Sequence, residues 1–158
     1  MPLAFRRRSD PSPAMADLPG LTVHRELDAD RMARLQLRTT HEIQRRFNHG
    51  HRAYVASIYG VPAAWGWIAS SVANVNESGA TLSLAHGERY LWNFVTLATF
   101  RGRGIFPRLL NAIVQCESVD GEHFWVEYSP ANHACGAGIR KAGFVNVAEA
   151  SGGVVDPP

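Results

Sequence analysis

An apolar run, Tyr90 to Leu97, leads into the basic glycine loop Arg101-Gly102-Arg103-Gly104 and then into an amphipathic stretch. This succession strongly constrains the fold, because such a run is typical of a strand covered on both faces. A helix that starts at the loop offers N–H groups without intrahelical partners, and its dipole adds about half a positive charge there. Glycines let a phosphate approach the main chain, and arginine forks fit phosphate oxygens. The pattern predicts a strand, a phosphate-binding loop and a helix, with an ordinary exposed turn as the alternative.

Several other classes of protein are excluded by the same sequence. The loop lacks the Lys-Ser/Thr ending of a P-loop and the three-glycine spacing of a dinucleotide-binding loop. The chain has 158 residues, which fits one domain. Its net charge of +2 is too small to argue for nucleic acid binding. No pair among the seven histidines has the spacing of a zinc site, so no metal is expected.

The cysteines and the N-terminal region bear on the cellular setting. Cys116 and Cys135 form neither a metal-type pair nor a disulfide framework, so reduced thiols in a cytoplasmic protein are the simpler interpretation. No segment approaches the roughly 18 apolar residues of a membrane span. Residues 1–17 are rich in Arg, Pro and Ser, which predicts a flexible segment before a single domain over residues 18–158. Arg6 to Arg8 are expected in a solvated tail, with contact to RNA or lipid as the alternative.

Alternation of apolar and polar residues predicts strands, and apolar stripes between capping residues predict helices. In chain order we expect a strand at 21–27, helices from Asp28 or Asp30 and through 42–47, a hairpin over 52–68, a strand at 90–97, a helix from 105 to near 120, a strand at 123–128, a helix from Asn132 to Gly143 and a strand at 144–147. Residues 72–88 receive no assignment. The helix after the glycine loop should bury a stripe of Ile105, Leu109, Ile113 and Cys116. This order predicts an α/β (α+β) fold with a mixed, mainly antiparallel sheet.

Two motifs in this order resemble those of the GCN5-related N-acetyltransferase (GNAT) superfamily. Arg101-x-x-Gly104 follows the fourth expected strand, and Asn132 precedes a helix that ends in Lys141-Ala142-Gly143-Phe144. The resemblance implies a central sheet whose fourth and fifth strands splay apart, flanked by helices. Phe106 departs from the pattern, because the family usually has Gly or Ala there, so its ring either turns away from the loop or narrows it. The family's closing hairpin would be reduced to a short piece around Val154-Val155.

The resemblance also implies acetyl-CoA as co-substrate. The main chain of Phe94, Val95 and Thr96 would pair with the pantetheine arm like an added strand, and a backbone N–H near Thr96 would meet the oxyanion of the reaction. Asn132 would hydrogen-bond the arm near the thioester. The amides that would bind the pyrophosphate belong to Arg101, Gly102, Arg103, Gly104, Ile105 and Phe106.

Acetyl transfer needs a neutral amine, whereas an amine like that of lysine has a pKa of about 10.4 and is almost fully protonated at pH 7. Glu127 is the candidate base. It lies five residues before Asn132, which resembles the spacing of the base glutamate in the superfamily's ribosomal-protein N-terminal acetyltransferases. An ordinary surface carboxylate is the alternative, and Glu88, Glu122 and His86 are weaker candidates.

The departure of the thiol needs less help than the deprotonation of the amine. The same relatives carry an acid tyrosine seven residues after the asparagine, where this chain has Ile139. A thiol like that of cysteine has a pKa of about 8.5, so it leaves as the thiolate or takes a proton from water or from Tyr128. Cys135 lies at an expected helix start, where thiolates are stabilised. The superfamily nevertheless works by direct attack in a ternary complex, so no acyl-enzyme is expected.

The function implied by the resemblance is that of an acetyl-CoA-dependent N-acetyltransferase, acting in the cytoplasm on a primary amine of a small molecule or of a protein N-terminus. A non-catalytic acyl-CoA sensor or scaffold is the rival interpretation, motivated by Ile139, Phe106 and the short C-terminus. An RNA-associated module is a second rival, against which the small net charge argues. No motif encodes the acceptor. A homodimer stays open, because exposed strand edges in this fold often pair.

Overall fold

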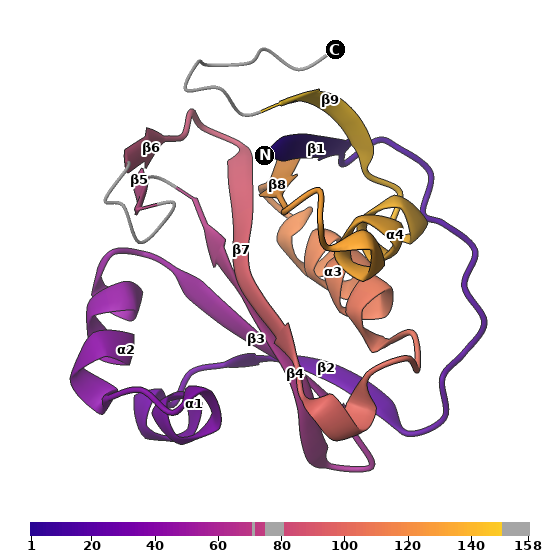
Figure 1. Ribbon diagram of the computed structural model, residues 1–158. Helices are drawn as coiled ribbons and strands as arrows, with labels where there is room; N and C mark the ends of the chain where they lie inside the picture. The colour runs from indigo at the N-terminus through magenta and orange to yellow at the C-terminus, as the bar shows by residue number, and fades with distance from the viewer. Residues whose placement is uncertain (71, 75–80, 150–158) are drawn as a thin grey trace.

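The computed structural model describes residues 1–70, 72–74 and 81–149 (Figure 1). Its strands are β1 (Pro2–Arg7), β2 (Leu21–Glu26), β3 (Arg52–Ile58), β4 (Val61–Ala69), β5 (Val72–Asn74), β6 (Thr81–Ser83), β7 (Glu88–Thr96), β8 (His123–Glu127) and β9 (Val145–Glu149). Its helices are α1 (Ala29–Gln36), α2 (Thr40–Asn48), α3 (Ile105–Glu117) and α4 (His133–Lys141), with the 3-10 turn η1 (Ala98–Phe100). The elements expected from residue 21 onward are confirmed, and the stretch left unassigned contains β5 and β6. Within these described ranges, no helix is both long and apolar enough to cross a membrane.

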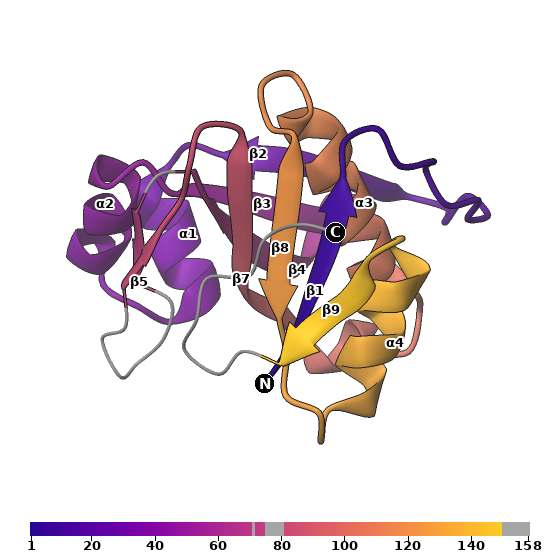
Figure 2. The same cartoon turned by 90° about the horizontal axis from the view of Figure 1, so that it is seen from above.

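Seven strands form one sheet in the order β2-β3-β4-β7-β8-β1-β9, and β5 pairs with β6 in a separate ribbon. Neighbouring strands are antiparallel except β7 and β8, which run parallel. Their pairing extends only from Glu88↔His123 to Leu91↔Val126, although β7 continues to Thr96. β7 and β8 are the fourth and fifth strands expected from the sequence, and the predicted splay between them is confirmed. Figure 2 shows β8, β1 and β9 side by side beyond this point of separation.

Helices cover both faces of the sheet (Figure 1). α3 and α4 lie on one face and α1 and α2 on the other, so the sheet separates two apolar cores. The core beneath α3 and α4 includes Leu91, Ile105, Leu109, Ile113, Phe124 and Ile139, and the core beneath α1 and α2 includes Met32, Ile43, Val55, Trp65 and Trp67. The two sides of the β7–β8 splay therefore face different apolar cores, one beneath each pair of helices.

β1 corrects the expectation that residues 1–17 form a flexible segment. Pro2–Arg7 is an internal strand between β8 and β9 and is antiparallel to both. Ala4 and Phe5 are 0% and 1% exposed. The prediction was wrong because Leu3 to Phe5 is a short apolar run among arginines and prolines, and its strand partners lie more than a hundred residues away in sequence. The closing piece expected around Val154-Val155 lies outside the described residues.

Arg6 shows why basic composition was misleading at this end of the chain. The residue is 1% exposed, and its Nη1 donates to Asn111 Oδ1 at 2.8 Å and to the carbonyl of Ala142 at 2.9 Å. Burial lowers the pKa of the guanidinium, and the charge of Asp10 partly opposes this effect. Arg6 is therefore a core residue held by α3 and by the end of α4, instead of part of a solvated tail.

The last turn of α3 also differs from the expected apolar stripe. Cys116 is exposed, and Glu117, one position further along the helix, faces the sheet and is 5% exposed. Its carboxylate accepts hydrogen bonds from Tyr54 Oη at 2.5 Å, from Arg89 Nε at 3.3 Å and from Arg52. A buried carboxylate is tolerated where guanidinium and hydroxyl donors satisfy it. Helical periodicity alone does not anticipate such partners, which come from β3 and β7.

Candidate active site

The backbone of β7 bulges where it parts from β8. The β4–β7 register passes from Trp67↔Trp92 to Trp65↔Val95, so Asn93 and Phe94 lie opposite the single residue Gly66. Asn93 has a φ of 54°, a left-handed conformation that asparagine adopts more readily than most residues. Gly66 is required here, because a Cβ at this position would lie 2.0 Å from Cε1 of the Phe94 ring.

The bulge bends β7 at the start of the stretch that was predicted to bind the pantetheine arm. Beyond Leu91, no strand among the described residues lies beside the edge of β7 that faced β8. Phe94, Val95 and Thr96 lie in this stretch and are partly exposed. Their backbone on the β8 side is therefore open to an extended ligand, in the manner of an added strand.

The glycine loop follows as predicted and opens α3. Gly102 and Gly104 have φ values of 77° and 75°, and Gly104 caps α3 without a side-chain hydrogen bond. Within the described residues, the N–H groups of Gly102, Arg103 and Gly104 have no acceptor, and those of Ile105 and Phe106 lie in the first helical turn, where no intrahelical acceptor exists. The loop thus presents a set of free donors at the positive end of a helix dipole, which suits a phosphate.

The arginines of the loop are exposed and make local contacts. Arg101 Nε donates to the carbonyl of Thr96 at 3.0 Å, and the Arg103 guanidinium carbon lies 5.3 Å from the centroid of the Phe100 ring. The Thr96 carbonyl thus accepts one hydrogen bond from Arg101, and its second lone pair can accept another from a ligand. Sequence reasoning missed Arg108, whose side chain joins the carbonyl of Gly104, at 2.8 Å, to that of Ala16 in the N-terminal connection, at 2.6 and 3.0 Å.

Phe106 turns its ring toward the splay. The ring lies 5.7 Å from that of Phe94 in an edge-on arrangement. It also packs on Gly138 of α4, where a Cβ would lie 2.5 Å from its Cδ2 atom. The aromatic pair of Phe94 and Phe106 therefore forms a wall between β7 and α4, and the ring packs away from the loop glycines.

Glu127 is the last residue of β8 and follows directly after the last β7–β8 pair. Its side chain is half-buried and makes no hydrogen bond or ion pair with the described residues. Burial raises the pKa of its carboxyl, and the positive α-amino group of the chain partly opposes this effect. On the same face, the charge of Glu127 adds to the burial that raises the pKa of Tyr90. The structure thus places an unpartnered carboxylate with a raised pKa at the splay.

The weaker candidates for the base lie at the opposite ends of these strands. Glu88 accepts a hydrogen bond from Trp125 Nε1 at 3.0 Å, Glu122 pairs with Arg8 at 3.4 Å, and His86 is exposed before β7 begins. The paired starts of β7 and β8 lie four residues of strand, or about 13 Å, away from the splay. None of the three is brought near the bulge.

The remaining candidates surround the start of α4. Asn132 caps this helix through its Oδ1, which accepts from the N–H of Cys135 at 3.0 Å, while its amide nitrogen makes no hydrogen bond within the described residues. Burial raises the pKa of the Cys135 thiol, so the thiolate expected at a helix start is disfavoured. Tyr128 is 8% exposed and donates its hydroxyl to Asn146 Oδ1 at 3.0 Å, and Ile139 is a core residue. Asn132 is exposed, and its amide nitrogen is a donor that a ligand can use.

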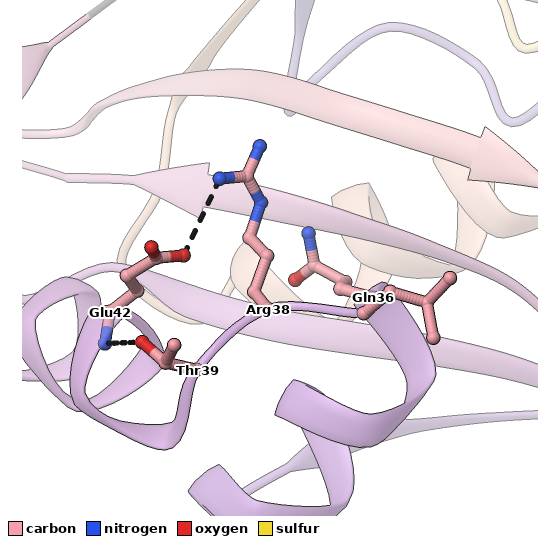
Figure 3. A pocket seen from close by; sticks show the side chains of 5 residues that line it. Gln36, Arg38, Thr39 and Glu42 are labelled. Atoms are coloured by element: carbon pink, nitrogen blue, oxygen red, sulfur yellow. Dashed lines mark hydrogen bonds and ion pairs between the residues drawn. The ribbon is translucent and has the colours of Figure 1, made fainter.

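A hollow of about 500 Å³ lies on the other face, at the connection between α1 and α2. Figure 3 shows its lining, in which Arg38 pairs with Glu42 at 3.5 Å and Thr39 Oγ1 accepts from the N–H of Glu42 at 3.2 Å. Gln36 also lines the hollow. Within residues 1–70, 72–74 and 81–149, no cluster of three or more His, Cys, Asp or Glu side chains is arranged to hold a metal ion.

No protein-family model and no curated protein sequence matches this chain. Solved structures do match it. A protein of the GNAT family from Novosphingobium aromaticivorans superposes with a TM-score of 0.60 at 20% identity, over 92% of this chain and 60% of the other. The ribosomal-protein-alanine N-acetyltransferase from Brucella melitensis gives a TM-score of 0.59 at 12% identity, over 87% and 99%. This chain has the GNAT fold.

A third structure with the GNAT fold contains the coenzyme. The aminoglycoside N-acetyltransferase AAC(6′)-Iy in complex with CoA superposes with a TM-score of 0.53 at 20% identity, over 78% of this chain and 91% of the other. The present chain spans less than two thirds of the Novosphingobium protein but nearly all of the other two. The splay, the bulge and the glycine loop described above are therefore parts of a fold that is found in acetyltransferases.

Proposed function

We propose that this chain is an acetyl-CoA-dependent N-acetyltransferase that acetylates a primary amine by direct attack. The observation that carries the proposal is the separation of β7 and β8 between a loop of free N–H groups and the unpartnered carboxylate of Glu127. Acetyl-CoA is an elongated ligand with a pyrophosphate and a thioester. The glycine loop, the open edge of β7 and the carboxylate of Glu127 would meet the pyrophosphate, the pantetheine arm and the acceptor amine in that order.

The coenzyme would be held by the backbone more than by side chains. The pyrophosphate would accept from the amides of Gly102 to Phe106, with the charges of Arg101 and Arg103 nearby. The pantetheine arm would run along Phe94, Val95 and Thr96, and the amide nitrogen of Asn132 would donate near the thioester.

Glu127 would remove the proton from the acceptor amine. Burial moves the pKa of the Glu127 carboxyl toward neutral pH, as a general base requires. A positioned base typically accelerates a reaction by a hundred to ten thousand fold. The amine then forms the new C–N bond, and a backbone N–H near Thr96 would donate to the oxyanion. When the C–S bond breaks, the nitrogen loses its second proton to solvent, and the departing thiolate takes a proton from solvent, because the Tyr128 hydroxyl is already bonded to Asn146. Cys135 takes no part in these steps.

Thermal unfolding with and without acetyl-CoA tests the binding part of the proposal. A ligand at a hundred times its dissociation constant adds about 2.7 kcal/mol of stability. For a chain of this size, such a gain raises the unfolding midpoint by about 5–10 °C. Gly102→Glu should abolish the rise by placing a carboxylate against the pyrophosphate. Gly60→Glu is the matched control, because Gly60 also has a positive φ, of 81°, and open space around it, but lies outside the loop.

Release of CoA in the presence of amines tests the catalytic part. Acetyl-CoA turnover that depends on an added amine supports the proposal. Stabilisation by acetyl-CoA that is lost in Gly102→Glu, together with silence across a broad amine panel, would instead favour the acyl-CoA sensor. No stabilisation in the unsubstituted protein, or an equal rise in Gly102→Glu, would contradict the phosphate cradle.

A further inference from the structure

A group of five side chains connects α1 and α2 to the bulge of β7. We call it the Arg46 cluster; its members are Gln36, Arg46, Trp67, Trp92 and Asn93. Trp67 Nε1 donates to Gln36 Oε1 at 2.7 Å, and Gln36 Nε2 donates to Asn93 Oδ1 at 2.9 Å. Arg46 Nη1 donates to the same Asn93 oxygen at 2.9 Å. The cluster therefore ends on the bulge residue that directly precedes the predicted pantetheine-binding stretch.

Arg46 lies against two neighbouring indole rings, whose centroids are 6.2 Å apart. Its guanidinium carbon is 4.8 Å from the ring centroid of Trp67 and 4.7 Å from that of Trp92. Such contacts between a cation and aromatic faces hold a guanidinium in place when it is partly removed from water. The two ring contacts and the hydrogen bond to Asn93 thus hold the side chain in position.

The charge of Arg46 is not balanced. Its acceptor is a neutral amide oxygen, and no carboxylate among the described residues pairs with it; Glu42, the nearest acid in its helix, pairs with Arg38 instead. Burial lowers the pKa of the Arg46 guanidinium to about 10, with repulsion from Arg38 added and attraction to Glu42 opposing, so the group remains charged at neutral pH. Only one of its five N–H donors is used within the described residues.

A half-buried guanidinium with free donors is a site for an anion, because carboxylates and phosphates accept from it in a charge-assisted, forked geometry. We propose that the Arg46 cluster binds a carboxylate or phosphate group of the acceptor, so that the substrate is an amine that carries an anionic group. This inference rests on the proposed acetyltransferase function. The hollow at the α1–α2 connection shares Gln36 with the cluster and gives room for the rest of the acceptor (Figure 3).

The competing explanation is that Arg46 and Gln36 only hold the bulge in place. A bulge clamp would matter equally for every acceptor, since it would position the thioester. An anion site distinguishes acceptors by charge. Matched amines that differ only in charge therefore separate the two explanations.

The test compares amino acids with their carboxamides, and glucosamine 6-phosphate with glucosamine, as acceptors in an assay of CoA release. We expect the anionic member of the preferred pair to have a kcat/KM at least about tenfold higher, in keeping with a hydrogen bond to a charged group. Arg46→Gln should raise KM for that member by a similar factor and leave the neutral member within about twofold. Arg46→Lys should retain part of the preference. Arg45→Gln is the matched control, because Arg45 is the exposed neighbour in the same helix.

Equilibrium binding provides a readout that needs no turnover. The same amines are titrated in the presence of CoA and followed by the intrinsic tryptophan fluorescence, to which Trp67 and Trp92 of the cluster contribute. Anion-selective binding that Arg46→Gln removes supports the cluster even if no acceptor is acetylated, in which case only the proposed function fails. Equal binding of both members of each pair, a preference that survives Arg46→Gln, or an equal loss of turnover for both members would overturn the anion site.

Discussion

Phe5→Ala tests whether the N-terminal residues belong to the sheet. The Phe5 ring is 1% exposed and packs against Trp125 with ring centroids 4.5 Å apart. Replacing a buried phenylalanine by alanine costs about 3–5 kcal/mol through lost burial and the cavity left behind. In a domain of this size each kcal/mol lowers the unfolding midpoint by about 2–4 °C, so a fall of roughly 6–20 °C is expected.

The measurement is thermal unfolding by circular dichroism, with Val119→Ala as control. Val119 is 88% exposed, so the control should melt within about 1–2 °C of the unsubstituted protein. Hydrogen exchange adds a local readout, because β1 pairs with both neighbours: backbone amides of residues 3–6 should be protected like those of β8. A Phe5→Ala midpoint equal to that of the control, together with rapid exchange at residues 3–6, would refute the placement of β1 and restore the flexible segment.

Two further predictions concern the site. Glu127→Gln should lower turnover at pH 7 by about a hundred to ten thousand fold and leave acetyl-CoA binding intact, with a loss that shrinks as pH approaches the pKa of the amine. Because the pKa of Glu127 is raised in the folded state, ionisation of its carboxyl destabilises the folded protein. Glu127→Gln should therefore also raise the unfolding midpoint slightly at pH 7 but not at pH 4. An unchanged pH–rate profile would remove Glu127 from the mechanism. Gly66→Ala should weaken acetyl-CoA binding in calorimetry, because a Cβ there displaces the Phe94 ring and the bulge with it; unchanged affinity would show that the bulge does not contact the coenzyme.

Much of the fold and of the coenzyme side of the site could be predicted because their signals are local. Strand β7 is mostly apolar from Tyr90 onward, Asp28 and Asn132 cap α1 and α4 as expected, and the glycines at 102 and 104 adopt the positive φ that their loop requires. Each of these features depends on a few consecutive residues. A short motif is therefore nearly sufficient to predict the backbone conformation at these positions.

β1 could not be predicted because its stability comes from partners far away in sequence. Leu3 to Arg6 are a weak strand signal by themselves, and burial of Arg6 depends on acceptors at Asn111 and Ala142. The same is true of Glu117, whose carboxylate is satisfied from β3 and β7. A charged residue next to an apolar stripe is normally read as exposed, and only the three-dimensional contacts reverse that reading.

The Arg46 cluster combines both situations and shows where a signal was present but ambiguous. Arg46 lies three residues after buried Ile43, so helical periodicity places it beside the apolar face of α2. Tryptophans at 67 and 92 belong to different strands, and no pattern in α2 indicates that both contact this arginine. A cation on the buried side of an amphipathic helix thus has two possible explanations, an internal partner or an external anion. Arg46 has no acidic partner among the described residues, and this observation favours an anion that arrives with the substrate.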